Sequence, residues 1–220
     1  MNVYNQNIDF LCDQRKMSIT EFEQIIYIPK VRIMEPTPDE LIRIADYFQL
    51  PIDVLLTKQL RINDKIALKS IRLVLLDVDG TLTDGGMYFT ENGDQMKKYN
   101  TKDGMAIKNN QKKNLSFGII SHGHKLNMVK NRASLLGIEH IYVGQESKTV
   151  ILEQWCKNLN ITAKEVAYIG DDINDLEIMA KVGVSACPAD AVNAVKKEAD
   201  IILKKNGGAG CVREFLDEWM

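Results

Sequence analysis

The 220-residue chain has few cysteines and no long apolar run, and each of these features excludes certain classes of protein. No apolar stretch approaches the roughly 18 residues that span a bilayer, so we expect no membrane segment. The first ten residues lack the basic start and apolar run of a secretory signal. Neither paired nor metal-like spacing relates the four cysteines, which predicts reduced thiols in a cytoplasmic protein. They are Cys12, Cys156, Cys187 and Cys211.

An excess of one charge is also lacking. The 28 basic and 30 acidic side chains leave a net charge of −2, which provides no global attraction to nucleic acid or to an anionic membrane. The hydrophobic fraction of 45% is enough for a substantial core, and the charged fraction of 26% is typical of globular proteins. The length suits one large domain, or a domain with a small partner.

The chain divides near residue 60. Before it, apolar residues recur at helical spacing over residues 8–15, 18–26 and 39–48, and a short helix is expected over 51–57. Ser18 and Glu21 have the spacing of a capping box. We therefore expect a small all-α domain, a linker and a larger domain, with bounds at residues 1–60, 61–70 and 71–220.

In the larger domain, strand-like apolar runs alternate with helical ones, which predicts an α/β fold with a doubly wound parallel sheet. The expected strands are residues 71–76, 116–120, 140–143, 166–169, 184–187 and 200–203. Asn92 and Gly93 lie between two further strand-like runs, residues 87–90 and 95–100, and this dipeptide is a strong hairpin signal. A final helix is expected over residues 212–219.

Two carboxylates, Asp77 and Asp79, stand where the first expected strand opens into a loop at Gly80. In an open parallel sheet, ligands bind at the carboxyl ends of the strands. One carboxylate can attack phosphorus while the other transfers protons. The alternative is a strand end capped by acidic turn residues, and for the pair taken alone this alternative is favoured.

Two more polar residues follow expected strands. Ser121 and the loop amides after it can hold phosphate oxygens before the next helix, although a helix N-cap is an equal explanation. Lys148 begins a helix, where the dipole disfavours a cation. A lone lysine there is usually a solvated surface charge. Because the helix dipole makes this position mildly unfavourable for a cation, a functional role for Lys148 is slightly favoured.

The loop after the fourth expected strand is more specific. Asp171, Asp172 and Asp175 place three acids within five residues, and they repel one another unless a cation joins them. A hard, oxygen-preferring ion such as Mg²⁺ suits a site of carboxylates. Helix capping explains one or two of these acids but not all three.

Taken in order, these segments resemble the four motifs of the haloacid dehalogenase superfamily of phosphatases: residues 77–81, Ser121, Lys148 and residues 170–172. From about residue 71 onward, further segments are similar to the 3-deoxy-D-manno-octulosonate 8-phosphate phosphatases, whose relatives act on nonulosonate 9-phosphates. These segments are residues 84–86, 100–104, 166–172 and 207–215. The resemblance implies a Rossmann-like core with a β-hairpin flap and no large cap, since the chain from Asp84 to Ala106 has no room for one.

The resemblance implies Mg²⁺-dependent hydrolysis through an aspartyl phosphate. Asp77 would be the nucleophile, and Asp79 would protonate the leaving sugar oxygen and then deprotonate water. Asp77, Asp171 and the Asp79 backbone carbonyl would hold the metal. Lys148 would bind the phosphate oxygens. The other residues expected to bind phosphate or substrate are Thr81, Asp103, Ser121, His122 and His124, and the supporting residues are Asp172 and Asp175.

This chain departs from the relatives after the second expected strand. They have Thr/Ser-Gly-Arg there, whereas this chain reads Ser121-His122-Gly123-His124, one residue longer. Ser121 is the preferred phosphate ligand, and His122 is the alternative. His124 stands where the relatives have an arginine that meets the substrate, and a neutral imidazole cannot reproduce the bidentate grip of a guanidinium on a carboxylate. This departure leaves the identity of the sugar acid open.

In the relatives, the hairpin packs between the subunits of a tetramer, so we expect a homotetramer. The glycine-rich residues 207–210 resemble a segment that reaches toward an adjacent site, although they also suit a flexible loop before the last helix.

Residues 8–56 look like a degenerate helix-turn-helix of the Cro/repressor type, which raises a different class of function: a DNA-binding regulator with a phosphatase-like sensor domain. The stretch from residue 26 to 36 is too short for a full recognition helix. Residues 1–60 contain nine acids and six bases, a net charge of −3, which is the wrong sign for a phosphate-binding surface. We therefore favour a module for oligomerisation or partner contact, and expect no nucleic acid among the partners.

Overall fold

The computed structural model of the chain describes residues 2–57, 60, 68, 70–92, 95–113, 115–123 and 126–220. These residues form two compact units, Met1–Asn63 and Asp64–Met220. Most of the expected linker, the hairpin residues 93 and 94, and His124 lie outside the described residues. No helix in the described part of the chain is long and apolar enough to cross a membrane.

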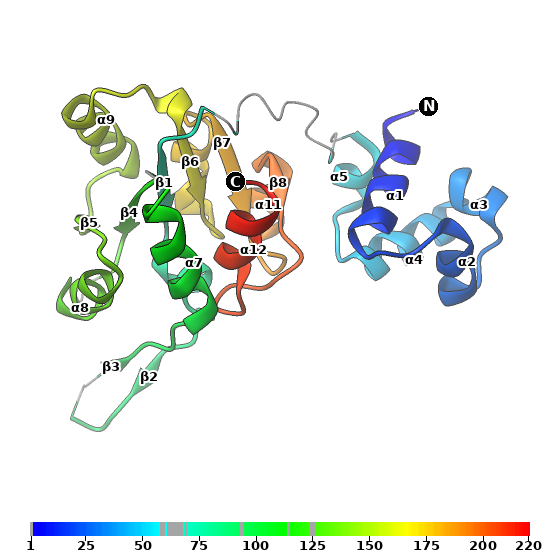
Figure 1. The fold of residues 1–220 in the computed structure, drawn as a ribbon. Coiled ribbons are helices and arrows are strands. Elements are labelled where there is room, and N and C mark those ends of the chain that lie inside the picture. Colours follow the sequence, from blue (N-terminus) through cyan, green and yellow to red (C-terminus); the bar gives the residue numbers. More distant parts are fainter. Residues whose placement is uncertain are drawn as a thin grey trace. The chain divides into compact units, whose positions relative to one another are not determined.

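The described part of the first unit is built from five helices (Figure 1). They are α1 (Val3–Gln14), α2 (Ile19–Ile26), α3 (Lys30–Met34), α4 (Pro38–Phe48) and α5 (Ile52–Thr57). The four predicted helical segments are confirmed, and Ser18 and Glu21 form the predicted capping box. Each helix contributes a fully buried apolar side chain to one core: Ile8, Phe22, Ile33, Ile44 and Leu55.

Helix α3 was not predicted. It has five residues, little more than one turn, and Ile33 anchors it in the core while Val31 is exposed. So short an element has almost no periodic pattern to detect. Its length agrees with the expectation that this segment holds no full recognition helix, and DNA binding by this unit gains no support from it.

The second unit contains a six-stranded parallel sheet with the order β5-β4-β1-β6-β7-β8, which confirms the predicted doubly wound fold (Figure 1). The strands are β1 (Leu73–Leu76), β4 (Ser116–Ser121), β5 (His140–Val143), β6 (Val166–Ile169), β7 (Val184–Cys187) and β8 (Ile201–Ile202). All six agree with the predicted runs to within two residues at either end. β1 and β6 are buried at every position, as expected for central strands covered on both faces.

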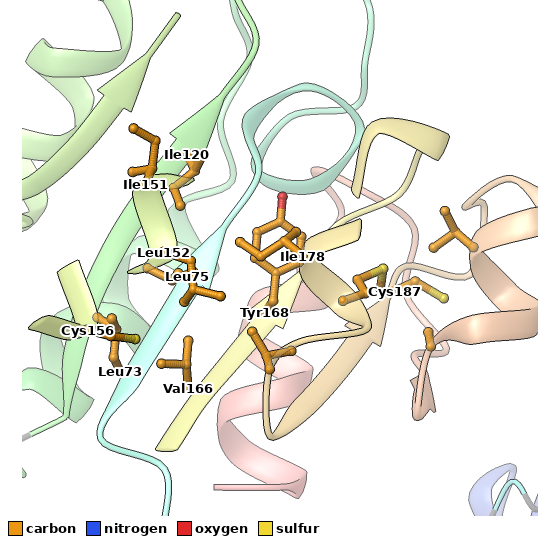
Figure 2. Close-up of a cluster of buried hydrophobic side chains, with 14 of the residues drawn as sticks. Leu73, Leu75, Ile120, Ile151, Leu152, Cys156, Val166, Tyr168, Ile178 and Cys187 are labelled. Atoms are coloured by element: carbon orange, nitrogen blue, oxygen red, sulfur yellow. The ribbon is translucent and has the colours of Figure 1, made fainter. Parts of the chain in front are cut away.

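Helices cover both faces of the sheet. Their bounds are α7 (Thr101–Gln111), α8 (Leu126–Leu136), α9 (Lys148–Leu159), α10 (Leu176–Met179), α11 (Asn193–Glu198) and α12 (Cys211–Glu218), with short turns at Ala163–Glu165 (η2) and Ile173–Asp175 (η3). Side chains of α9, α10 and α11 join those of β1 and β6 in one apolar cluster (Figure 2). α7 packs against α8 and α12, which lie with it on the opposite face.

The strand order places a switch point beside β1. The chain leaves β1 toward β4 on one side and later leaves β6 toward β7 on the other, so the connections diverge between β1 and β6. At such a point the loops part and leave a crevice outside the carboxyl ends of the strands. The predicted site residues that follow β1, β4 and β6 are therefore brought to one edge.

A small hairpin, β2 (Tyr88–Phe89) and β3 (Gln95–Met96), comes between β1 and α7 in the chain and projects away from the sheet (Figure 1). Tyr88 pairs with Met96 in antiparallel register, and an isolated bridge between Thr83 and Tyr99 ties the base of the hairpin. The strands are shorter than the predicted runs. Tyr88, Phe89 and Met96 are at least half exposed, so little burial supports a longer ladder.

Candidate active site

Asp77 follows β1 directly and is 5% exposed. Its backbone N–H donates to the carbonyl of Ile169 at 3.0 Å, which extends the β1–β6 pairing by one residue into the loop. The chain then makes a wide turn, Val78–Leu82 (η1), closed by a hydrogen bond from Thr83 N to Val78 O at 2.9 Å. The nucleophile candidate is thus held by the sheet, and the turn carries Asp79 past it.

Gly80 makes this turn possible. Its φ is +86°, in the left-handed region, and a Cβ there would collide with the Asp171 carboxylate. The Asp171 side chain therefore lies directly against the turn, close to Asp77. The Thr81 hydroxyl donates to Asp171 Oδ1 at 3.0 Å, and Thr81 is fully buried, so this contact positions Asp171.

Lys148, the first residue of α9, is buried and contacts three side chains. Its Nζ lies 2.7 Å from Asp77 Oδ1, 2.5 Å from Asp175 Oδ1 and 3.0 Å from the Tyr168 hydroxyl. Burial opposes the charged ammonium, but Asp77 and Asp175 more than offset it and raise the pKa of Lys148 above its ordinary value. The alternative of a solvated surface lysine is therefore wrong.

Asp175 organises the loop after β6. Its Oδ1 accepts from Lys148 and Tyr168, and its Oδ2 accepts the backbone N–H groups of Asp171 at 2.8 Å and Asp172 at 3.1 Å. The Tyr168 hydroxyl points out of the apolar cluster toward this loop (Figure 2). Because both oxygens of Asp175 are engaged, this side chain shapes the loop, as the sequence analysis expected of it.

The carboxyl groups of Asp77 and Asp171 have raised pKa values, because they are buried beside other acids. Burial, reinforced by Asp175, raises the pKa of Asp77 to about 7 despite the opposing effect of Lys148. Burial together with Asp77 and Asp175 raises the pKa of Asp171 to about 7. One carboxylate oxygen from each of the three acids lies within 4.8 Å of the others. Such a donor set fits a hard divalent cation, and Asp77 and Asp171 are the members with oxygens available to it.

Asp79, two residues after Asp77 in the turn, forms an ion pair with Lys97, the residue after β3. Lys97 was not among the predicted site residues. The signal available was alternation, since Lys97 and Lys98 are adjacent in an extended segment and must point to opposite sides.

The loop after β4 lies beside Asp79. Ser121 ends β4, is buried, and accepts a hydrogen bond from Gly123 N at 3.2 Å. A Cβ at Gly123 would lie 4.0 Å from Asp79 Oδ2. The His122 ring instead faces the neighbouring loops, with Nε2 3.0 Å from the carbonyl of Glu146 and Nδ1 3.4 Å from the Asn174 amide.

Asp103 occupies a different environment from the one expected of a substrate ligand. It is 1% exposed, and its Oδ1 accepts from the backbone N–H of Arg213 at 2.7 Å, in the first turn of α12. Nearby, the Asn100 amide donates to the carbonyl of Gly208 at 3.1 Å. Asp103 and Asn100 therefore hold the glycine-rich segment before α12.

This glycine-rich segment packs on the catalytic turn of its own chain. A Cβ at Gly207 would overlap the Gly80 carbonyl, and one at Gly208 would overlap the backbone of Asp84. Gly208 N also donates to the carbonyl of Thr81 at 2.9 Å. The segment thus braces the turn, in place of the flexible loop considered as its alternative.

Known proteins resemble about two thirds of this chain. Residues 124–216 match the family model for haloacid dehalogenase-like hydrolases. The 3-deoxy-D-manno-octulosonate 8-phosphate phosphatase of Salmonella typhi is 40% identical over 149 residues, which cover 68% of this chain and 79% of that protein. The Yersinia pestis protein of the same name is 37% identical over 148 residues, or 67% of this chain and 79% of that protein.

Solved structures give the same picture. The crystal structure of the Yersinia pestis phosphatase matches with a TM-score of 0.68 and 35% identity, over 70% of this chain and 82% of that one. The Moraxella catarrhalis phosphatase matches with a TM-score of 0.68 and 32% identity, over 70% of this chain and 88% of that one. The latter structure is a complex with a magnesium ion, a phosphate ion and a KDO molecule.

Proposed function

Because this chain belongs to the haloacid dehalogenase-like hydrolases, we propose that it is a Mg²⁺-dependent phosphomonoesterase acting on a phosphorylated keto-sugar acid, 3-deoxy-D-manno-octulosonate 8-phosphate. The observation that carries this proposal is the buried Asp77–Lys148 pair beside Asp171, at the carboxyl ends of the strands. The identity of 40% with a phosphatase of that name supports the substrate.

Asp77 is the proposed nucleophile. Its carboxylate oxygen forms a bond to phosphorus while the bond from phosphorus to the sugar oxygen breaks, which gives an aspartyl phosphate. Asp79 gives a proton to the leaving sugar oxygen and then takes one from the water that attacks phosphorus and releases Asp77. The position of Asp79 in the turn, two residues after Asp77 and open to the loop of Ser121, suits this second role.

The carboxylates of Asp77 and Asp171, with the backbone carbonyl of Asp79, are the proposed ligands of Mg²⁺. The ion would offset the repulsion between the carboxylate and the phosphate dianion. Thr81 keeps Asp171 in place for this purpose, and Asp175 keeps the Asp171 backbone in place.

The proposed phosphate ligands are Lys148 and Ser121. Lys148 brings a positive charge that offsets the negative charge spread over the phosphate oxygens in the transition state, and its contacts with Asp175 and Tyr168 hold it at Asp77. Ser121 is preferred to His122 as the ligand from the second motif, since the His122 ring is engaged by the loops of Glu146 and Asn174.

A homotetramer and a cytoplasmic location complete the proposal. Four apolar side chains of the hairpin region are at least half exposed, which supports burial of this flap against another subunit. They are Met87, Tyr88, Phe89 and Met96. The four cysteines are free thiols, all buried, which suits a reducing compartment.

The test is phosphate release from a panel of monoesters, with and without Mg²⁺. The panel contains 3-deoxy-D-manno-octulosonate 8-phosphate, a nonulosonate 9-phosphate and a hexose 6-phosphate. The proposal predicts Mg²⁺-dependent turnover with a preference for the octulosonate. Preference for the nonulosonate would move the substrate to the longer sugar acid, and turnover of hexose phosphate alone would refute the sugar-acid assignment.

A further inference from the structure

The segment after β3 of the hairpin brings a second lysine to the candidate active site, at Asp79. Lys97 forms an ion pair with Asp79, and its side chain is only 12% exposed, whereas that of Asp79 is 41% exposed. The next residue, Lys98, points the other way and pairs with Asp84 at 2.9 Å on the surface, with its side chain 67% exposed. Of these two adjacent cations, Lys97 is the one directed to the site.

The backbone that carries Lys97 is tied down on its C-terminal side. Tyr99 forms a bridge with Thr83, in the segment that leaves the catalytic turn. Asn100 then donates to the Gly208 carbonyl. The segment that holds the Lys97 ammonium against Asp79 is therefore anchored just after Lys97.

The location of this ammonium indicates its ligand. Asp79 is the residue that transfers a proton to the leaving oxygen, so a group bonded to Asp79 lies on the leaving-group side of phosphorus. A substrate with a carboxylate in its leaving group therefore adds a negative charge to a site that already contains Asp79 and the acidic cluster of Asp77 and Asp171. The acids of the site repel this carboxylate unless a cation of the protein lies next to it.

Lys97 has donors for that contact, whereas Lys148 is held at the phosphate end of the site. The Lys148 ammonium contacts Asp77, Asp175 and Tyr168, which keep it beside the nucleophile. Among the residues that the structure describes, Lys97 donates one hydrogen bond, to Asp79. Two of its N–H donors are thus available to a ligand.

We propose that Lys97 is a specificity-determining residue that binds the carboxylate of the sugar-acid leaving group. This inference rests on the proposed function, because it assumes that a phosphate monoester is the substrate. It also gives a reason for a preference for acidic sugars. The Lys97 ammonium offsets the charge of a carboxylate in the leaving group, whereas a neutral leaving group gains nothing from it.

The experiment compares Lys97→Met with the matched control Lys98→Met, which removes a neighbouring lysine from the opposite side of the same segment. Steady-state kinetics are measured with 3-deoxy-D-manno-octulosonate 8-phosphate and with p-nitrophenyl phosphate, which has no carboxylate. Lys97→Met is expected to lower the ratio of kcat/KM for the two substrates by about 10- to 100-fold, mainly through KM, as loss of a charged hydrogen bond predicts. Lys98→Met should leave this ratio within about twofold.

A second readout is binding of the product. Free 3-deoxy-D-manno-octulosonate should inhibit Lys97→Met about 10- to 100-fold more weakly than the wild type, and Lys97→Arg should recover part of the affinity. Equal losses on both substrates would overturn the proposal, because Lys97 would then act only through Asp79. Retained turnover of p-nitrophenyl phosphate shows that the variant is folded. Absence of turnover of every monoester by the wild type would instead refute the proposed function itself.

Discussion

Replacement of Lys148 by methionine tests the electrostatics at the centre of this site. Methionine keeps most of the aliphatic stem and removes the ammonium that contacts Asp77 and Asp175. The exposed fractions of these three side chains are 1%, 8% and 0%, so water cannot replace the lost charge without rearrangement. Removing one partner of such a buried ion pair costs about 3–5 kcal/mol.

The loss of folding stability caused by Lys148→Met should depend on pH. In the wild type the pKa of Asp77 is already raised to about 7, and loss of the Lys148 charge raises it further. A folded-state pKa above the unfolded value means that the folded state binds more protons between those values, so its stability falls as pH rises through this window. The penalty at pH 8 should therefore exceed that at pH 5 by up to about 1.4 kcal/mol, since pH 8 lies about one unit above the wild-type pKa of Asp77.

Urea unfolding without Mg²⁺ measures the effect. Both tryptophans, Trp155 and Trp219, belong to the second unit, so their fluorescence reports on it alone. Lys181→Met is the matched control, since it removes a surface ion pair with Glu153 and should change stability far less at either pH. A loss below about 1 kcal/mol for Lys148→Met, or the same loss at both pH values, would refute this account of the cluster.

Three further predictions concern the same framework. Gly80→Ala should lower the free energy of unfolding by about 1–2 kcal/mol because of the positive φ at this position, which urea unfolding measures. It should also lower kcat for phosphate release at least about 100-fold, because the added Cβ displaces Asp171. The proposed Mg²⁺ ligands Asp77 and Asp171 must lose their protons to bind the ion, so the Mg²⁺-induced rise in Tm over EDTA-treated protein should grow as pH increases from 5.5 to about 7.5. Asp103→Ala should lower stability by about 1–3 kcal/mol and leave KM unchanged, because it unpairs the buried N–H of Arg213; a raised KM at unchanged stability would instead indicate a substrate ligand.

Much of the fold was accessible from the sequence because the strands of the sheet are continuous apolar runs. Residues 166–169 and 184–187 were predicted without error, since buried parallel strands leave an unambiguous pattern, and so was the partly buried edge strand at residues 140–143. The hairpin was predicted in place but too long. Its register depends on a turn and on few buried contacts, and these do not produce a clear boundary in the sequence.

Motif spacing also predicted which acids would meet at the sheet edge. Asp77 and Asp171 come together because their strands are neighbours, and Lys148 joins them from the start of α9. Local pattern could not reveal the partners of Asp103 or Lys97, because both contacts join elements by tertiary packing. Asp103 was predicted to meet substrate because it lies in a family motif, yet it supports α12, more than 100 residues away in the chain.

The central claim is that Asp77 is the nucleophile, and phosphate release by Asp77→Asn tests it most directly. Asparagine has nearly the same shape and removes a carboxylate whose pKa burial has already raised to about 7, so the variant should keep the wild-type Tm in EDTA to within a few degrees. We expect turnover of 3-deoxy-D-manno-octulosonate 8-phosphate to fall below about 10⁻³ of the wild-type rate, since the remaining groups cannot form the covalent intermediate. Turnover above about one tenth of the wild-type rate by the folded variant would contradict the assignment.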